Sequence, residues 1–68
     1  MMNMVTTGKR IKKAMVKKKM SAKALAEQLN VSEQAVWKYT SGKMMPKLDN
    51  FCELCKILGV SADKLLGL

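Results

Sequence analysis

The chain has 68 residues, enough for one small domain, and its 13 Lys or Arg against 5 Asp or Glu give a formal net charge of +8. Many Lys, Leu, Ala and Met residues and few aromatic or β-branched ones favour an all-α fold. Two cysteines and no His exclude a disulfide framework and a complete zinc site, so neither a metal nor a cofactor is expected. Cys55 is expected as a small core residue, with Cys52 nearer the surface.

The first helix is expected from about residue 8 to residue 18, after a loosely ordered lead-in over residues 1–6. Its apolar positions Ile11, Ala14 and Met15 recur at helical spacing among lysines. Residues 9–23 hold eight basic residues and no acid, whereas the rest of the chain is balanced. Such a run attracts a polyanion, with nucleic acid as the first candidate and an acidic membrane surface as the second, although it also suits a solvated face.

The second and third helices are expected to form a helix, a tight turn and a helix. The second begins after the N-cap Ser21 and ends at Asn30, because Asn tolerates a left-handed backbone. The third begins after the N-cap Ser32 and ends near Ser41, before Gly42. The positions that must be buried are Leu25, Ala26, Leu29, Val31, Val36 and Tyr39. This spacing is typical of a helix-turn-helix, whose second helix enters the major groove of DNA.

Two more helices complete the chain. Pro46 permits a new helix just beyond it, and Gly59 ends that helix. Ser61 caps a last short helix with Leu65 and Leu66 on its apolar side. The fourth helix carries the cleanest apolar stripe of the chain: Leu48, Phe51, Leu54, Cys55 and Leu58.

The ordered motifs resemble those of the lambda-repressor/Cro-like (XRE-type) helix-turn-helix family. They are Leu25-Ala26, Asn30-Val31-Ser32, Gly42-Lys43, Pro46 and Leu58-Gly59-Val60-Ser61, and with Arg10-Ile11 they cover about residues 8–68. The resemblance implies a single compact five-helix domain over residues 1–68. It also implies a Cro- or repressor-like transcriptional regulator of phage or bacterial origin, located in the cytoplasm. Duplex DNA is the expected partner, bound by a homodimer that forms at least on DNA, with no membrane association.

The resemblance also implies the DNA-facing residues. Base contacts are expected from Glu33, Gln34, Trp37 and Lys38, and backbone contacts from Ser21, Ser41, Lys43 and Lys19. Helical geometry agrees, because residues 33, 34, 37, 38 and 41 lie opposite the buried face of their helix. Gln can pair with adenine, Lys with guanine and Glu with cytosine. Glu33 and Gln34 are also ordinary residues for the first turn of a helix, where Glu suits the helix dipole.

Trp37 stands where the family usually has a polar residue. An exposed indole is costly in water, so three environments are open to it. It contacts thymine methyls or sugars in the groove, it packs against a partner chain, or it folds over Met44 or Met45.

Three further positions depart from the family pattern. Ala22 replaces a Gln that touches DNA, and Met15 and Thr40 replace a buried Arg–Glu pair. Loss of one partner alone would leave a buried charge without a partner, whereas loss of both together leaves none. Lys19 replaces a Gly, and a left-handed Lys costs about 1 kcal/mol, so the turn before the second helix is open to a different shape.

Other functions are weighed against DNA binding. An enzyme is not expected, since the chain has no His, no phosphate-cradling glycine loop and no paired carboxylates. The main alternative is a protein-interaction adaptor or antitoxin-like partner with Trp37 as its anchor. Sequence-independent binding of RNA or a membrane surface through the lysines comes third. Dimerisation is expected through the last helix, around residues 62–68, or on DNA.

Overall fold

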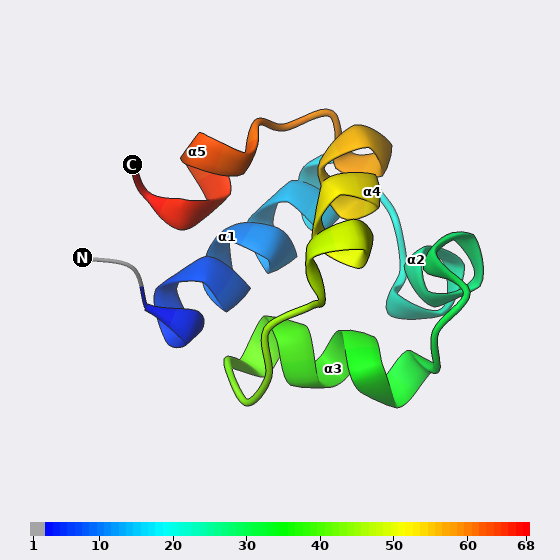
Figure 1. Cartoon of the computed structure of the whole chain (residues 1–68). Helices are drawn as coiled ribbons and strands as arrows, with labels where there is room; N and C mark the ends of the chain where they lie inside the picture. Colours follow the sequence, from blue (N-terminus) through cyan, green and yellow to red (C-terminus); the bar gives the residue numbers. More distant parts are fainter. Residues whose placement is uncertain (1–2) are drawn as a thin grey trace.

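Five helices follow one another in the computed structural model, which describes residues 3–68 (Figure 1). They are α1 (Met4–Lys17), α2 (Ala22–Leu29), α3 (Glu33–Ser41), α4 (Leu48–Leu58) and α5 (Ala62–Leu66). No strand occurs in the residues that the structure describes. The predicted all-α, five-helix class is therefore confirmed.

Local hydrogen bonds set the predicted starts of α2, α3 and α5. The side-chain oxygens of Ser21, Ser32 and Ser61 each accept from the backbone N–H three residues later, at 3.1 Å. Asn30 and Gly42 adopt left-handed backbones, with φ of 57° and 78°, and end α2 and α3. These short connections hold α2 and α3 in a helix-turn-helix.

The start of α1 differs from the prediction. Oδ1 of Asn3 accepts from the N–H groups of Val5 and Thr6, at 2.8 and 3.2 Å, so the helix begins at Met4 rather than at Gly8. The loosely ordered lead-in expected over residues 1–6 is wrong from residue 3 onward, and residues 1 and 2 lie outside the described part. Burial of Thr7 and Gly8 explains the longer helix, because tertiary packing adds to the cap.

The turn between α1 and α2 keeps a left-handed residue although it lacks glycine. Lys19 has a φ of 56° and donates its N–H to the carbonyl of Val16 at 3.0 Å. The side chain is exposed, so nothing forces the backbone into another shape. A local cost of about 1 kcal/mol is therefore retained in this turn.

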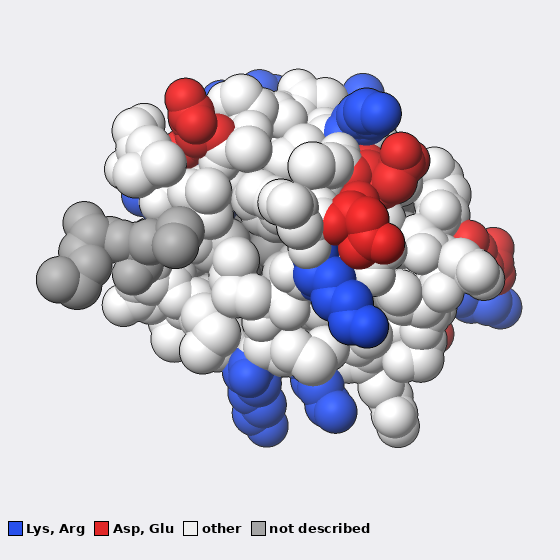
Figure 2. Space-filling model, viewed as in Figure 1, with Lys and Arg blue, Asp and Glu red and all other residues white. Residues whose placement is uncertain are grey.

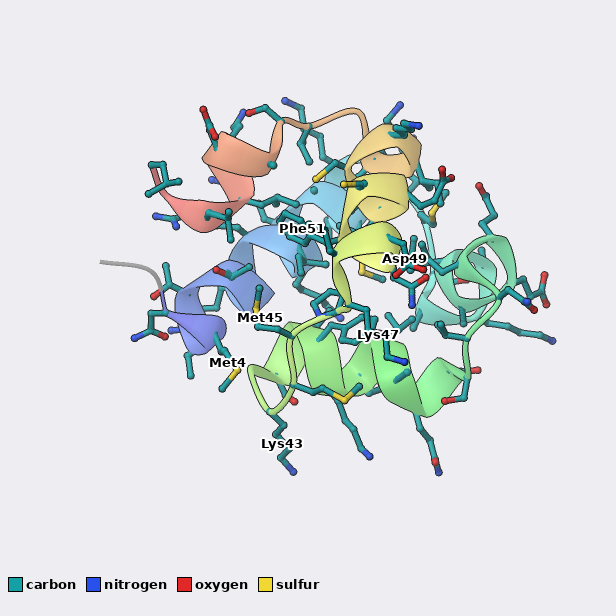
Figure 3. All side chains as sticks on the ribbon, viewed as in Figure 1. Met4, Lys43, Met45, Lys47, Asp49 and Phe51 are labelled. Atoms are coloured by element: carbon teal, nitrogen blue, oxygen red, sulfur yellow. The ribbon has the colours of Figure 1, made fainter. Side chains whose placement is uncertain are left out.

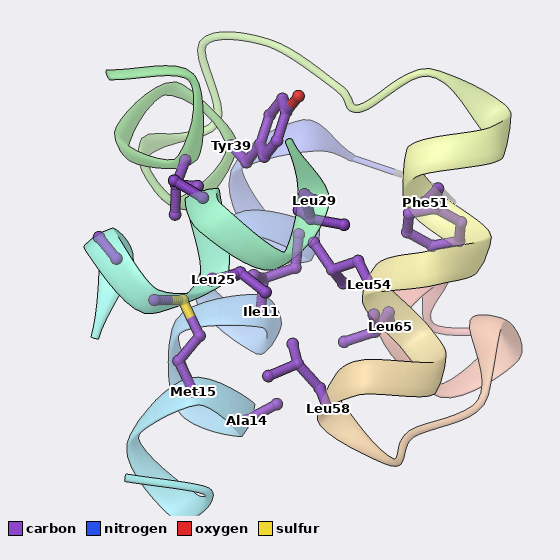
Figure 4. Close-up of a cluster of buried hydrophobic side chains, with 13 residues drawn as sticks. Ile11, Ala14, Met15, Leu25, Leu29, Tyr39, Phe51, Leu54, Leu58 and Leu65 are labelled. Atoms are coloured by element: carbon purple, nitrogen blue, oxygen red, sulfur yellow. The ribbon is translucent and has the colours of Figure 1, made fainter. Parts of the chain in front are cut away.

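The core lies where α1, α2, α4 and α5 converge, and side chains of α3 close it (Figure 4). All six positions predicted to be buried in the helix-turn-helix pack there, Val31 only partly. Leu48 is wrong as a core residue, because it is 78% exposed. It occupies the first position of α4, beyond the packed part of that helix, whereas Pro46 in the preceding loop is buried.

A close backbone approach fixes α3 against α1. A Cβ atom added to Gly8 would lie 2.5 Å from the carbonyl oxygen of Tyr39 and 2.7 Å from that of Thr40. Real Cβ contacts essentially never come this close, so only glycine fits here. The position of α3 on the domain therefore depends on this glycine.

Candidate nucleic-acid interface

The outer face of α3 is the centre of the candidate interface. Val36 and Tyr39 anchor the helix in the core. Because they occupy the inner face, the opposite face projects into solvent. All four predicted base-contact residues are exposed on α3: Glu33, Gln34, Trp37 and Lys38.

Trp37 links α3 to α1. Its indole Nε1 donates to Oε2 of Glu33 at 3.4 Å, and the ammonium nitrogen of Lys12 lies 5.2 Å from the ring centroid. The indole remains 50% exposed. None of the three environments expected for Trp37 included α1, and Lys12 was missed as a neighbour. Its signal in the sequence was Gly8, one helical turn earlier, where α1 and α3 approach closely.

The predicted backbone-contact residues fall into two groups at opposite ends of the helix-turn-helix. Lys19 and Ser21 are exposed just before α2, and the hydroxyl oxygen of Ser21 is used as the helix cap. Ser41 and Lys43 are exposed at the end of α3, where Lys43 points away from the body of the domain (Figure 3). Ala22, in contrast, is buried and offers no polar contact.

Lysine side chains project along the lower edge of the face seen in Figure 2, below α3. The acidic side chains on this face lie over α2, α4 and α5, with other basic side chains beside some of them. The acidic residue of α3 itself, Glu33, is engaged by the indole of Trp37. The solvent-facing side of α3 is thus flanked by positive charge, as a polyanion requires.

Two hollows meet at Trp37. One, of about 280 Å³, lies between α1 and the start of α2 and includes the apolar side chains of Met15 and Val16. The other, of about 520 Å³, lies between α1 and the second half of α3 and includes Lys12, Lys38 and Lys43. Trp37 and Lys12 line both hollows, so the indole lies between them.

The two positions that carry an ion pair in the family are filled without charge. Met15 is buried at 3% exposure, and the half-buried Thr40 donates its hydroxyl to the carbonyl of Trp37 at 3.2 Å. α1, which carries Met15, and α3, which carries Thr40, are thus joined by apolar packing and by their close approach at Gly8. This agrees with the joint replacement expected from the sequence.

The two cysteines are free thiols on α4. Cys52 is exposed and Cys55 is partly buried against the core, as expected. Burial raises the pKa of the Cys55 thiol, and the neighbouring Cys52 raises it further. Residues 3–68 contain no cluster of three or more His, Cys, Asp or Glu side chains that could hold a metal ion. Within the same residues, each helix is too short or too polar to cross a membrane.

Comparisons with curated proteins find regulatory relatives. Over 59 residues the chain is 41% identical to the SPbeta prophage-derived uncharacterized HTH-type transcriptional regulator YonR of Bacillus subtilis (strain 168), covering 87% of this chain and 55% of that protein. Over 57 residues it is 39% identical to multiprotein-bridging factor 1c of Arabidopsis thaliana, covering 84% of this chain and 38% of that protein. The chain thus spans about half or less of the length of these relatives.

Comparisons with solved structures find DNA complexes. The P22 c2 repressor bound to a synthetic operator superposes with a TM-score of 0.84 and 32% identity, covering 88% of this chain and 91% of that chain. SinR, a master regulator for biofilm formation solved with DNA, gives a TM-score of 0.79 and 26% identity, covering 88% and 97%. Both resemble this domain over nearly their whole length.

A family model described as helix-turn-helix matches residues 11–65, which is most of the chain. The match spans α2, α3 and the turn between them, whose caps and buried residues are described above. It also agrees with the lambda-repressor-like architecture of the superposed repressor. The chain therefore belongs to the helix-turn-helix family.

Proposed function

We propose that this chain is a sequence-specific, Cro- or repressor-like regulator that reads the major groove of duplex DNA with α3. The observation that carries the proposal is the outer face of α3, where Gln34 and Lys38 are exposed on a helix anchored by buried Val36 and Tyr39. The superposed P22 c2 repressor is bound to an operator, which supports the same use of this fold. On this proposal the chain is a binding protein and not an enzyme.

The base contacts divide among three polar side chains of α3. Gln34 offers an amide that can pair in two places with the edge of adenine, and Lys38 can donate to guanine. Glu33 can accept from cytosine, but its carboxylate also accepts from the indole of Trp37. Glu33 therefore reads a base only in competition with that hydrogen bond, and we expect Gln34 and Lys38 to carry more of the discrimination.

The backbone contacts flank α3 on both sides. Lys19 and Ser21 lie before α2, and Ser41 and Lys43 lie at the end of α3. Lysines on two sides neutralise phosphates and fix the register of the helix in the groove, without carrying sequence information. The formal net charge of +8 supplies the long-range attraction.

Dimerisation on DNA is part of the proposal. Two copies that bind one face of the duplex place their recognition helices about 34 Å apart, one helical turn. The C-terminal segment around α5 offers a contact surface, because Leu68 is 81% exposed there. A bacterial or phage-infected cytoplasm is the setting in which such a regulator would act.

The experiment that tests the function is selection of bound duplexes from a random DNA pool, at about 150 mM salt, where weak phosphate binding fades. We expect enrichment of a palindrome with half-sites about one helical turn apart. A variant with both Gln34→Ala and Lys38→Ala serves as the matched control, and it should enrich no sequence. Selection that yields only weak, salt-sensitive retention of all duplexes would contradict the proposal.

A second candidate is a role as a protein-binding adaptor. Two observations favour it: Trp37 exposes half of its surface, and one relative is named a multiprotein-bridging factor. Large exposed aromatic side chains often anchor protein interfaces. Tight binding of one protein by a chain with no affinity for duplex DNA would favour this role over regulation.

A further inference from the structure

The basic hollow between α1 and α3 has a composition that suits an anion. Its lining consists of Lys12, Trp37, Lys38, Thr40, Ser41 and Lys43, which come from α1, α3 and the loop after α3. Three of the six side chains are lysines, and no carboxylate is among them. The three lysines come from three separate segments and line this open depression of about 520 Å³, and the side chain of Lys43 points away from the body of the domain (Figure 3).

The two hydroxyl groups of the hollow are already engaged. Thr40 donates to the carbonyl of Trp37 at 3.2 Å, and Ser41 donates to the carbonyl of Lys38 at 3.3 Å. The ammonium groups can therefore donate to a ligand directly, whereas Ser41 would first exchange its hydrogen bond to Lys38. An ammonium group binds phosphate chiefly as a point charge, without demanding a fixed planar geometry.

Lys12 owes its place in the hollow to two contacts between α1 and α3. Gly8, one turn earlier, brings the two helices together at the carbonyls of Tyr39 and Thr40. The ring of Trp37 then lies 5.2 Å from the ammonium nitrogen of Lys12, a distance at which the ring face attracts a cation. Lys12 is thus held beside the DNA-facing helix although it belongs to α1.

Three other basic residues of α1 lie elsewhere. Arg10, Lys13 and Lys17 line a different hollow, between α1 and α5, together with Lys64. The basic residues of α1 are therefore divided between different faces of the helix, and Lys12 shares a hollow with α3. This division provides a matched control, since Lys13 is the next residue along the same helix.

We propose that the basic hollow receives a phosphate group of the DNA backbone. Lys12 contacts this phosphate from α1, and Trp37 positions Lys12. The proposal rests on the DNA-binding function above. It adds a contact that neither the sequence nor the family match assigns. The phosphate belongs to DNA rather than to a free anion, because Lys38 lies both in the hollow and on the exposed face of α3.

The first test compares Lys12→Gln with Lys13→Gln on the duplex selected by the wild-type protein. Each phosphate contact contributes a slope of about −0.9 to the plot of log affinity against log salt. Lys12→Gln should therefore lower the magnitude of the slope by about 0.9. Between ~50 and ~200 mM salt, the variant should then lose about 3.5-fold less affinity than the wild type does. Affinity for the selected duplex and for a scrambled duplex should fall by the same factor.

The controls separate a phosphate contact from general charge. Lys13→Gln removes the same charge from α1 and should change the slope much less. Thr40→Val removes a hydroxyl from the hollow and should leave the slope unchanged. If Lys12→Gln has the same slope as the wild type, the proposal is overturned and the DNA-binding function remains intact. The same conclusion follows if Lys12→Gln changes the slope no more than Lys13→Gln does. A wild-type protein without duplex affinity overturns both.

The second test addresses positioning by Trp37. Trp37→Phe keeps an aromatic face, whereas Trp37→Leu removes it. The slope change caused by Lys12→Gln should persist in the Phe background and shrink in the Leu background, because only the ring holds the ammonium group in place. Equal slope changes in both backgrounds would refute positioning by the ring. Trp37 is the single tryptophan of the chain, so a shift of its fluorescence on Lys12→Gln independently reports the contact.

Discussion

Gly8→Ala is the substitution that tests most sharply how α3 is held on the domain. Inside an ordinary helix the change from Gly to Ala stabilises by about 0.5–1 kcal/mol, because Ala loses less backbone entropy on folding. At position 8 the new methyl group would lie 2.5 Å from the carbonyl oxygen of Tyr39, whereas ordinary van der Waals contact begins at 3.4 Å. The obstacle is backbone, so a rotamer change cannot relieve it.

The clash should outweigh the gain in helix propensity. Overpacking a well-packed interior typically costs about 1–3 kcal/mol, since backbone must move. Subtracting the propensity gain leaves a net loss of up to about 2.5 kcal/mol in the free energy of unfolding, with a midpoint of about 1 kcal/mol. For a domain of this size each kcal/mol lowers the melting temperature by about 4–8 °C.

Urea unfolding followed by circular dichroism measures this difference directly. Thr6→Ala is the matched control, because Thr6 is exposed on the same helix and gains propensity without a clash. The control should be neutral or slightly stabilised, while Gly8→Ala is destabilised. A Gly8→Ala protein at least as stable as the wild type would refute the close approach of α1 and α3.

Three further outcomes are expected. Thr7→Val should raise the free energy of unfolding by about 1 kcal/mol, because the buried Oγ1 of Thr7 has no hydrogen-bond partner among residues 3–68; a loss of stability in urea would count against this. Leu54→Ala should lower the free energy of unfolding by about 2–5 kcal/mol, whereas Leu48→Ala should lower it by less than about 0.5 kcal/mol. Equal losses would indicate that Leu48 belongs to the core. Timed alkylation with mass spectrometry should modify exposed Cys52 before Cys55, whose raised pKa leaves less thiolate at neutral pH; the reverse order would contradict its burial.

Local chemistry explains why much of the fold was predictable from the sequence. Ser21 and Ser32 cap helices through hydrogen bonds to nearby N–H groups, and Asn30 ends a helix by its own backbone preference. Each of these signals lies within a few residues of the boundary that it sets. The helix-turn-helix is built almost entirely from such signals, and its boundaries are confirmed.

The wrong predictions depend on packing between distant segments. The length of α1 was underestimated because Thr7 and Gly8 are buried, and Gly8 lies against the backbone of α3, which follows much later in the chain. Leu48 was misplaced because helical spacing identifies a face of α4 but not how far its neighbours extend along it. Hydrophobic periodicity contains neither piece of information.

The candidate site was predictable in part for the same reason. Exposure of Gln34 and Lys38 follows from the spacing of the buried residues of α3 alone. The contact between Lys12 and Trp37 joins two helices, so no local pattern predicts it. The roles of these side chains on DNA stay predictions.

On the proposed function, the exposed face of α3 distinguishes one DNA sequence from another. The most direct measurement is the affinity of the wild type, Gln34→Ala and Lys38→Ala for the selected duplex and for a scrambled duplex of the same composition. We expect each substitution to lower affinity for the selected duplex by about 1–3 kcal/mol, and Gln34→Ala to leave affinity for the scrambled duplex nearly unchanged. Equal losses on both duplexes, or no loss on either, would contradict reading of bases by α3.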